Sequence, residues 1–151
     1  MKDSLMLKKM VFGLIPAGGS LGGIASATYE GALKLTAIST TPYVDVSYAN
    51  DDELLPAAQY EYVVIKYKSD KSGTASIVPT AGGAEGAAHS FSVTGDGAYH
   101  TAVVKLAGDS AWTGNNPSFR FNFFDNASAG DTMYIESITL AETEAIAAGV
   151  N

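Results

Sequence analysis

The chain of 151 residues contains no cysteine, so disulfide bonds and thiolate metal sites are excluded. Charged residues make up only 17%, and 9 lysines and arginines face 16 aspartates and glutamates, which gives a net charge of −7. The cations are scattered, apart from Lys66, Lys68 and Lys71. We therefore expect no nucleic-acid partner, because phosphate binding needs a clustered basic surface.

No apolar run reaches the roughly 20 residues that a membrane-spanning helix needs, so membrane insertion is not expected. The apolar stretch after Lys8-Lys9, followed by Ala25-Ser26-Ala27, imitates a secretory signal. Pro16 and the glycines at positions 18 to 23 interrupt it, and we interpret it as a first strand and a glycine-rich loop. Export by a signal peptide is therefore not expected.

What the chain does have is apolar content of 46% and 16 glycines, enough for one core with many turns. We predict a single domain over residues 1–151, because a chain of this length buries its apolar surface in one core. The core is expected at about 10–140, and residues 141–151 form a C-terminal tail or an assembly arm.

Alternating apolar and polar residues, separated by turn signals, predict about 8–10 strands. In the segment 118–124, for example, Phe119, Phe121 and Phe123 fall on one face and Arg120 and Asn122 on the other. No amphipathic helix separates the strands, which excludes a parallel α/β fold. The fold class is therefore all-β, an antiparallel two-sheet β-sandwich of the jelly-roll type. The strands are expected at residues 10–15, 32–38, 43–48, 60–68, 73–78, 89–94, 98–106, 118–124 and 131–140.

Catalytic chemistry is not expected. No Gly-x-Ser-x-Gly turn occurs, so the nucleophile of a serine hydrolase has no recognisable setting. Paired carboxylates for a glycosidase could be drawn from 16 acids, a number at which coincidental pairs are common. The two histidines, His89 and His100, flank the turn at 95–97 and form with Asp96 or Glu85 at most a sparse metal site.

Calcium is the stronger ion hypothesis, because carboxylate and carbonyl oxygens at the edges of a β-sandwich suit this cation. The candidate ligands are Glu30, Asp131 and Glu136, which fall near strand ends. The alternative is that these carboxylates form a solvated acidic face. No other cofactor is expected.

Trp112, the single tryptophan, lies in a long connection and has two interpretations. On an exposed loop its ring would stack on a sugar, as aromatic platforms do. Alternatively it plugs one end of the sandwich, with Gly114 turning the backbone. We favour the plug.

Taken together, the motifs resemble those of jelly-roll carbohydrate-binding modules of the galactose-binding-like type, found in bacterial secreted and surface proteins. The resemblance spans about residues 31–140. The motifs are Gly31-Ala-Leu33, Thr41-Pro42-Tyr43, Tyr60-x-x-Val63-Val-Ile65-Lys-Tyr67-Lys-Ser69, Gly97-x-Tyr99-His100, Trp112-x-Gly114, Phe119-Arg120-Phe121, Gly130-Asp131 and Ile135-Glu136-Ser-Ile138.

In that pattern Trp112 and Arg120 are framework residues more than ligands. If the chain binds a glycan, the candidate residues are Trp112, Tyr99, His100 and Asn115. The loops at 18–23 and 80–86 and the two termini are further candidate functional regions.

We predict a non-catalytic jelly-roll module that is displayed on a cell surface or particle and binds a glycan or a neighbouring subunit. The alternative is a structural subunit of an assembly, such as a phage capsid decoration or fibre protein or a surface-layer component. The expected partners are therefore a glycan or protein subunits, including copies of the same chain, and the expected location is extracellular, at a cell surface or in a virion.

Overall fold

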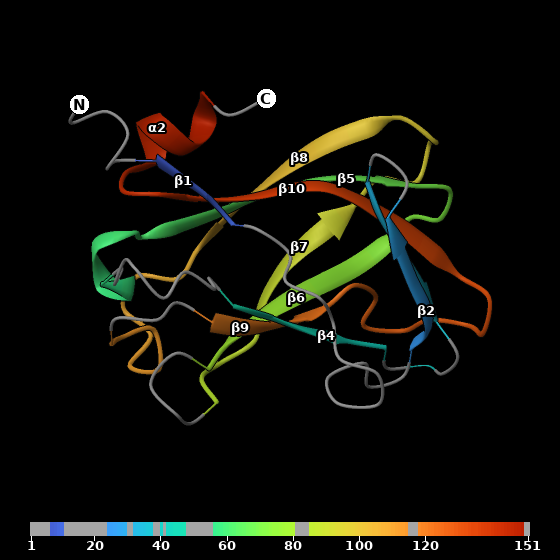
Figure 1. The fold of residues 1–151 in the computed structure, drawn as a ribbon, viewed down its shortest axis with the longest axis horizontal. Coiled ribbons are helices and arrows are strands. Elements are labelled where there is room, and N and C mark those ends of the chain that lie inside the picture. Colours follow the sequence, from blue (N-terminus) through green and yellow to red (C-terminus); the bar gives the residue numbers. More distant parts are fainter. Residues whose placement is uncertain are drawn as a thin grey trace.

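The computed structural model describes residues 7–10, 24–29, 32–37, 40, 42–47, 56–80, 85–114 and 118–149. Ten strands in this part of the chain form two antiparallel sheets, which lie against each other as the two layers of a sandwich (Figure 1). The prediction of an all-β, two-sheet sandwich with about 8–10 strands is confirmed.

The larger sheet has six strands. They are β1 (Leu7–Met10), β2 (Ile24–Tyr29), β3 (Leu33–Ala37), β5 (Tyr62–Ser69), β8 (Tyr99–Lys105) and β10 (Thr132–Ala141). The order is β2, β3, β10, β5, β8, and β1 pairs with the last part of β10. The predicted strand at 60–68 is thus an interior strand, paired with β10 on one side and β8 on the other.

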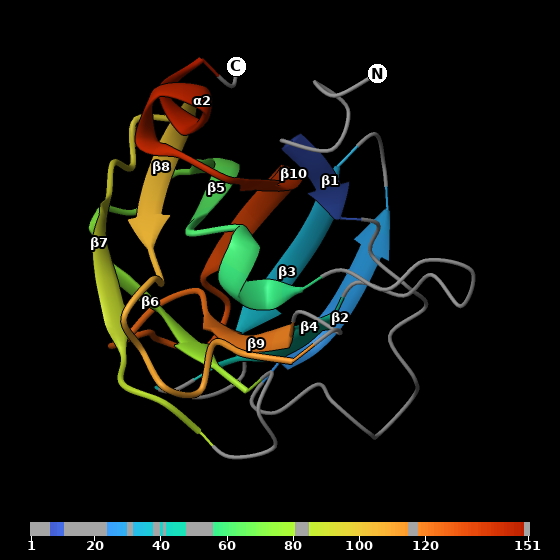
Figure 2. The ribbon, with the colours of Figure 1, turned by 90° about the vertical axis from the view of Figure 1, so that its left-hand side faces the viewer.

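The smaller sheet has four strands in the order β4, β9, β6, β7. Their bounds are β4 (Val44–Ser47), β6 (Gly73–Pro79), β7 (His89–Val93) and β9 (Ser118–Asn122). Figure 2 shows the sandwich end on, with β5, β8 and β10 in one layer and β6, β7 and β9 in the other. Strands β6 and β7, expected at 73–78 and 89–94, pair with each other in antiparallel orientation.

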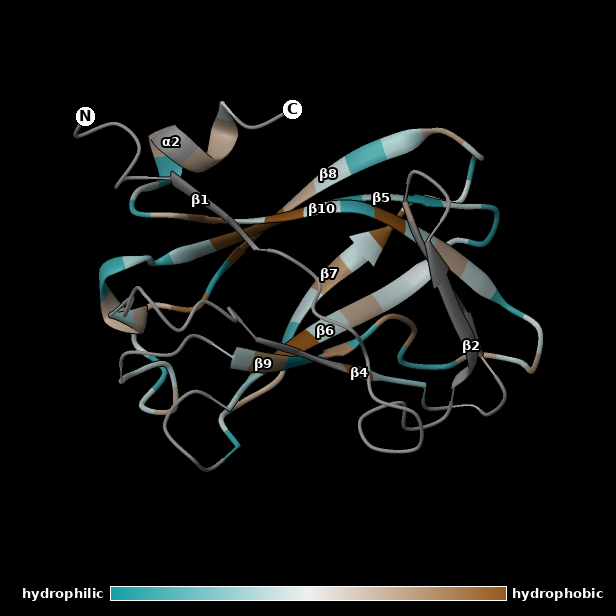
Figure 3. Ribbon diagram, viewed as in Figure 1, coloured by the Kyte–Doolittle hydropathy of each residue, from teal (hydrophilic) through white to brown (hydrophobic). Residues whose placement is uncertain are grey.

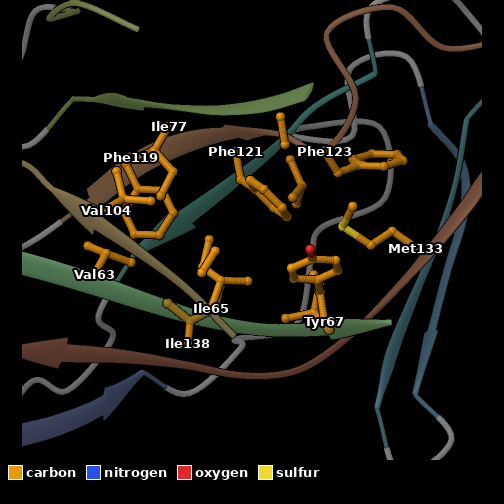
Figure 4. Close-up of a cluster of buried hydrophobic side chains, with 14 of the residues drawn as sticks. Val63, Ile65, Tyr67, Ile77, Val104, Phe119, Phe121, Phe123, Met133 and Ile138 are labelled. Atoms are coloured by element: carbon orange, nitrogen blue, oxygen red, sulfur yellow. The ribbon is translucent and has the colours of Figure 1, made fainter. Parts of the chain in front are cut away.

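The core lies between the two sheets and is built from the inward-facing residues of both (Figure 4). Ile65 of β5 and Phe119 of β9 are fully buried, and Phe121 is 1% exposed. Phe119 and Phe121 alternate with partly exposed polar neighbours in β9. Hydrophobic and hydrophilic segments also follow one another along β5 and β10 (Figure 3). The predicted core face of residues 118–124 is therefore confirmed.

Two strands of the large sheet differ from those expected from the sequence. Strand β2 was not predicted, because its sequence Ile-Ala-Ser-Ala-Thr-Tyr consists largely of small residues with no clear alternation. The first strand was expected at 10–15, whereas β1 occupies Leu7–Met10 and residues 11–15 lie outside the described residues.

The turn predicted at Gly95-Asp96-Gly97 leads from β7, in the small sheet, to β8, in the large sheet. A Cβ at position 95 would lie 2.1 Å from the backbone carbon of Lys71, so only glycine fits there without a shift. Gly97 has φ of 78°, a conformation that other residues adopt at a cost. Both glycines are therefore required where the chain crosses between the sheets.

Residues 141–149 form the end of β10 and a short helix, α2 (Glu144–Ala148), on the outer side of the large sheet. Ala147 is fully buried and packs with Val64 and Ala141. The tail thus covers part of its own chain, and an additional role as an assembly arm stays a prediction. In the described part of the chain, no helix is long and apolar enough to cross a membrane.

Candidate functional site

The outer surface of the four-stranded sheet carries two groups of polar side chains in contact, which together we call the polar face. It lies on the far side of β6 and β9 from the core. Its central members follow from the alternation in β9, where Phe119 and Phe121 point inward and the residues between them point outward. The polar face consists of Tyr43, Ser76, Glu85, Arg120, Asn122 and Asp125.

Arg120 lies at the centre of the polar face and is held from two sides. Its guanidinium carbon lies 4.3 Å from the centroid of the Tyr43 ring, a cation–π contact. Its Nη1 donates to Glu85 Oε2 at 3.0 Å, and the two side chains are 32% and 58% exposed. The guanidinium is therefore oriented by its neighbours while remaining accessible to solvent.

Asn122 and Ser76 face each other across β9 and β6, and their side chains are directly hydrogen-bonded. Asn122 Nδ2 donates to Ser76 Oγ at 3.1 Å, and Ser76 Oγ donates in turn to Asp125 Oδ1 at 2.9 Å. Ser76 is 3% exposed, so the hydroxyl fixes the amide and the carboxylate from below. The side chain of Asn122 is therefore held by Ser76.

The polar face combines hydrogen-bond donors and acceptors with one tyrosine ring. Guanidinium and amide groups donate, carboxylate and amide oxygens accept, and an aromatic ring supplies an apolar surface. This combination can hydrogen-bond hydroxyl groups and pack against the apolar side of a small ring. Arg120, expected to be more a framework residue than a ligand, is 32% exposed and contacts both Tyr43 and Glu85.

Trp112 does not lie on a binding surface. It is 3% exposed, and its Nε1 donates a hydrogen bond of 2.8 Å to the carbonyl oxygen of Tyr60, which is itself 1% exposed. The ring is part of the main core cluster. The favoured plug interpretation agrees with this position, and Trp112 is wrong as a candidate glycan-binding residue because its faces are covered.

Tyr99 and His100 are neighbours on β8 and therefore point to opposite sides of the large sheet. Tyr99 is 37% exposed on the outer side. His100 lies opposite Tyr67 in the register, with the ring centroids 6.1 Å apart, and its Nε2 is 2.9 Å from Asp96 Oδ1. The two do not form one platform, and neither belongs to the polar face. Asn115 lies outside the described residues.

Two of the three calcium candidates form ion pairs with lysines. Lys71 Nζ donates to Asp131 Oδ2 at 2.6 Å, and Lys66 Nζ lies 2.8 Å from Glu136 Oε1. The hydrogen bond from Lys71 lowers the pKa of Asp131 from its usual value, as does a hydrogen bond from the Ser128 amide. Glu30 lies outside the described residues. Among the residues that the structure describes, no three metal-ligating side chains cluster, and calcium binding stays a prediction.

The two histidines belong to separate pairs. His89 Nε2 lies 2.8 Å from Asp109 Oδ2, whereas His100 contacts Asp96. The carboxylate of Glu85 is directed to Arg120 instead. The strands that carry the two histidines, β7 and β8, belong to different sheets.

The glycine-rich loop at 18–23 lies outside the described residues, as do residues 81–84 of the loop at 80–86. Glu85, near the end of the second loop, reaches the polar face. The alternation in 118–124 was a sufficient signal for the outward position of Arg120 and Asn122. Their neighbours Ser76 and Glu85 could not be identified, because strand order is not visible in the sequence.

Comparisons with known proteins agree with the fold. A scan of the chain against protein-family models finds no match, and neither does a search of curated proteins. Solved structures of family 29 carbohydrate-binding modules resemble it over almost its whole length. One variant has a TM-score of 0.61 at 12% identity, covering 96% of both chains, and a second variant has 0.61 at 13% identity.

A third variant, complexed with mannohexaose, has a TM-score of 0.59 at 15% identity over 90% of this chain and 91% of that one. Since identity is so low, the likeness concerns the fold. The chain therefore has the β-sandwich fold of carbohydrate-binding modules, and the resemblance found in its motifs is confirmed at that level.

Proposed function

We propose that the chain is a non-catalytic glycan-binding module and that the polar face is its binding surface. The observation that carries the proposal is the position of Arg120, stacked on Tyr43, ion-paired with Glu85 and still 32% exposed. Such a fixed group binds with little loss of side-chain entropy, which is what a weakly interacting, hydroxyl-rich ligand requires.

The ligand class we propose is a neutral hexose polysaccharide. The polar face contains one guanidinium and two carboxylates besides its amide and hydroxyl groups, so no single charge dominates it. Hydroxyl groups of a sugar can both donate to the carboxylates and accept from Arg120 and Asn122. Solved structures of similar fold contain mannohexaose or cellulohexaose, which are neutral hexose chains.

Display at a cell surface or on a particle belongs to the same proposal. A non-catalytic module acts by attaching the cell or particle that displays it to a polysaccharide. This location is the one in which the fold found here would meet its ligand.

Affinity electrophoresis in gels containing mannan, glucomannan or soluble cellulose derivatives tests the proposal. We expect retardation of the wild type by at least one of these, and about tenfold weaker binding for Arg120→Ala and Asn122→Ala, since each removes hydrogen bonds to the ligand. Lys105→Ala is the matched control, because it removes one positive charge from an exposed position on the other sheet. Absence of retardation with every neutral polysaccharide, or equal retardation of all variants, would contradict the proposal.

One observation supports assembly with other subunits as a second function. Val103 is 42% exposed on β8, which is an edge strand of the large sheet. Exposed apolar side chains on an edge strand favour pairing with another chain. Solution scattering over a concentration series tests this: self-association that Val103→Lys abolishes would support it, and a monomer at every concentration would contradict it.

A further inference from the structure

The outer face of the large sheet carries a second ordered set of side chains, distinct from the polar face. Lys34 lies opposite Tyr134 in the register, Tyr134 lies opposite Lys68, and Lys68 lies opposite Tyr99. These four residues occupy four adjacent strands, β3, β10, β5 and β8. They form one row across the sheet, which we call the lysine–tyrosine row.

The side chains of the lysine–tyrosine row contact one another in sequence. Lys34 Nζ lies 5.8 Å from the centroid of the Tyr134 ring, and Lys68 Nζ lies 4.8 Å from the same ring. Lys68 Nζ is also 5.2 Å from the Tyr99 ring. Lys66 adds a further cation 5.6 Å from the Tyr99 ring. Each ring is thus flanked by two ammonium groups.

In the described part of the chain, no carboxylate forms an ion pair with the two lysines of the lysine–tyrosine row. Lys66 is ion-paired with Glu136 at 2.8 Å. Lys34 and Lys68 have no carboxylate within ion-pair distance among the residues that the structure describes, and their close contacts are tyrosine rings. Lys34 and Lys68, together with the ion-paired Lys66, therefore lie on one face of a chain whose net charge is −7. A positive region on an acidic protein attracts an anionic ligand to that one place.

The row is accessible. Tyr99 is 37% exposed. A depression of about 220 Å³ lies beside the row and is lined by Lys68, Ser69, Asp70, Gly97, Thr132 and Tyr134. Helix α2 covers the same side of the sheet, but at Val64 and Ala141, away from the row. Lys68 and Val64 are four residues apart on β5, about 13 Å in a strand.

We infer that the lysine–tyrosine row binds an acidic polysaccharide. Strands are about 4.8 Å apart, so the two rings are about 10 Å apart, with Lys68 between them and Lys34 on the other side of Tyr134. A polymer of acidic sugars presents ring faces and anionic groups in regular succession. Its sugar faces would pack on Tyr134 and Tyr99 while its carboxylates or sulfates pair with Lys68 and Lys34.

An acidic polysaccharide suits the row better than a simple anion does. Ammonium groups alone would suffice for a free anion, whereas here Tyr134 lies between Lys34 and Lys68, and Tyr99 lies on the other side of Lys68. The carboxylate of Asp70 at the depression and that of Glu136 beside Lys66 oppose a densely charged polymer. A polymer whose anionic groups are widely spaced therefore matches the row better than a densely charged one. The inference does not depend on the proposed function, because it concerns the other sheet.

The experiment compares polygalacturonate with its fully methyl-esterified form, which has the same sugar chain without the charges. We expect titration calorimetry to detect binding of polygalacturonate that weakens as salt rises, and no binding of the ester. The double variant Lys34→Ala/Lys68→Ala should bind about tenfold more weakly. Dextran sulfate binding that the double variant also weakens would extend the inference to sulfated glycans.

Tyr134→Ala and Tyr134→Phe separate the ring from the hydroxyl group. The phenylalanine variant keeps an aromatic face and should bind as the wild type does, whereas the alanine variant should lose affinity. Lys105→Ala, which removes one positive charge from another exposed position on β8, is the control and should leave polygalacturonate binding unchanged. Circular dichroism and the unfolding midpoint verify that every variant is folded.

Three results would overturn the inference. These are equal binding of the ester and the acid, unchanged affinity in the double variant, and equally tight binding of a single-stranded oligonucleotide that the same variant weakens. The first shows that charge is not recognised, the second that the row is not the site, and the third that the row recognises anions without sugar selectivity. Binding of neutral mannan that depends on Arg120 would survive each of these results.

Discussion

The indole nitrogen of Trp112 donates a hydrogen bond of 2.8 Å to the backbone carbonyl oxygen of Tyr60, 52 residues earlier in the chain. Ala57 also donates its amide to the carbonyl oxygen of Gly114, at 2.8 Å. Two connections, 56–60 and 106–114, are thereby fixed to each other at one end of the sandwich. Trp112 closes the core at this end.

Trp112→Phe should therefore lower stability without affecting glycan binding. The substitution keeps an aromatic ring but leaves the buried carbonyl of Tyr60 without the indole donor, a loss of about 1–3 kcal/mol in the free energy of unfolding. Chemical denaturation measures the loss, and affinity electrophoresis measures binding by the folded fraction. Loss of glycan binding in a fully folded Trp112→Phe variant would show that Trp112 contributes to the binding site.

Alanine substitutions at Ile65, Phe119 and Phe121 should each lower the free energy of unfolding by about 2–5 kcal/mol, because all three side chains are buried between the sheets. Thr101→Ala is a suitable control, since Thr101 is exposed on β8 and points away from the core. Equilibrium unfolding in urea gives the four values. Losses under about 1 kcal/mol at all three core positions would contradict the assignment of the core.

The alternation in the sequence was sufficient to identify the sandwich and its core. In β9, for instance, Phe119 and Phe121 faced inward as their period of two required. It was not sufficient for the lysine–tyrosine row, because Lys34, Lys68 and Tyr99 become neighbours only through the strand order β3, β10, β5, β8. Chain connectivity does not reveal that order. For Trp112, the predicted structural role as a plug agrees with the structure, and its candidate role as a glycan ligand does not.

Calcium binding at Asp131 can be distinguished from the ion pair that the structure shows. A calcium ion held by Asp131 predicts that calcium raises the melting temperature of the wild type, that chelator reverses the effect, and that Asp131→Asn is insensitive. Loss of the pair with Lys71 predicts a lower melting temperature for Asp131→Asn whether or not calcium is present. Lys71→Met is the matched control, because it breaks the pair and retains the carboxylate. A wild type insensitive to both calcium and chelator would contradict the calcium prediction.

Asp109 should make the stability of the fold depend on pH. Its side chain is 6% exposed and accepts hydrogen bonds from the amides of Ala87 and Ala111 besides contacting His89. The hydrogen bond with His89 is the main cause that lowers the pKa of Asp109 below its usual 3.8, followed by the one from Ala111.

A carboxyl group with a lowered pKa in the folded state stabilises the fold above its unfolded pKa, and the contribution disappears as pH falls through the folded value. The wild type should thus exceed Asp109→Ala in free energy of unfolding by about 1–3 kcal/mol at neutral pH, because the variant loses the hydrogen bonds from the Ala87 and Ala111 amides and from His89. The difference should narrow as the pH falls below 3.8. Urea denaturation at a series of pH values measures it, with Asp70→Ala as an exposed control. If the difference in free energy of unfolding between wild type and Asp109→Ala stays constant at the lowest pH measured, the ionised carboxylate of Asp109 does not stabilise the fold.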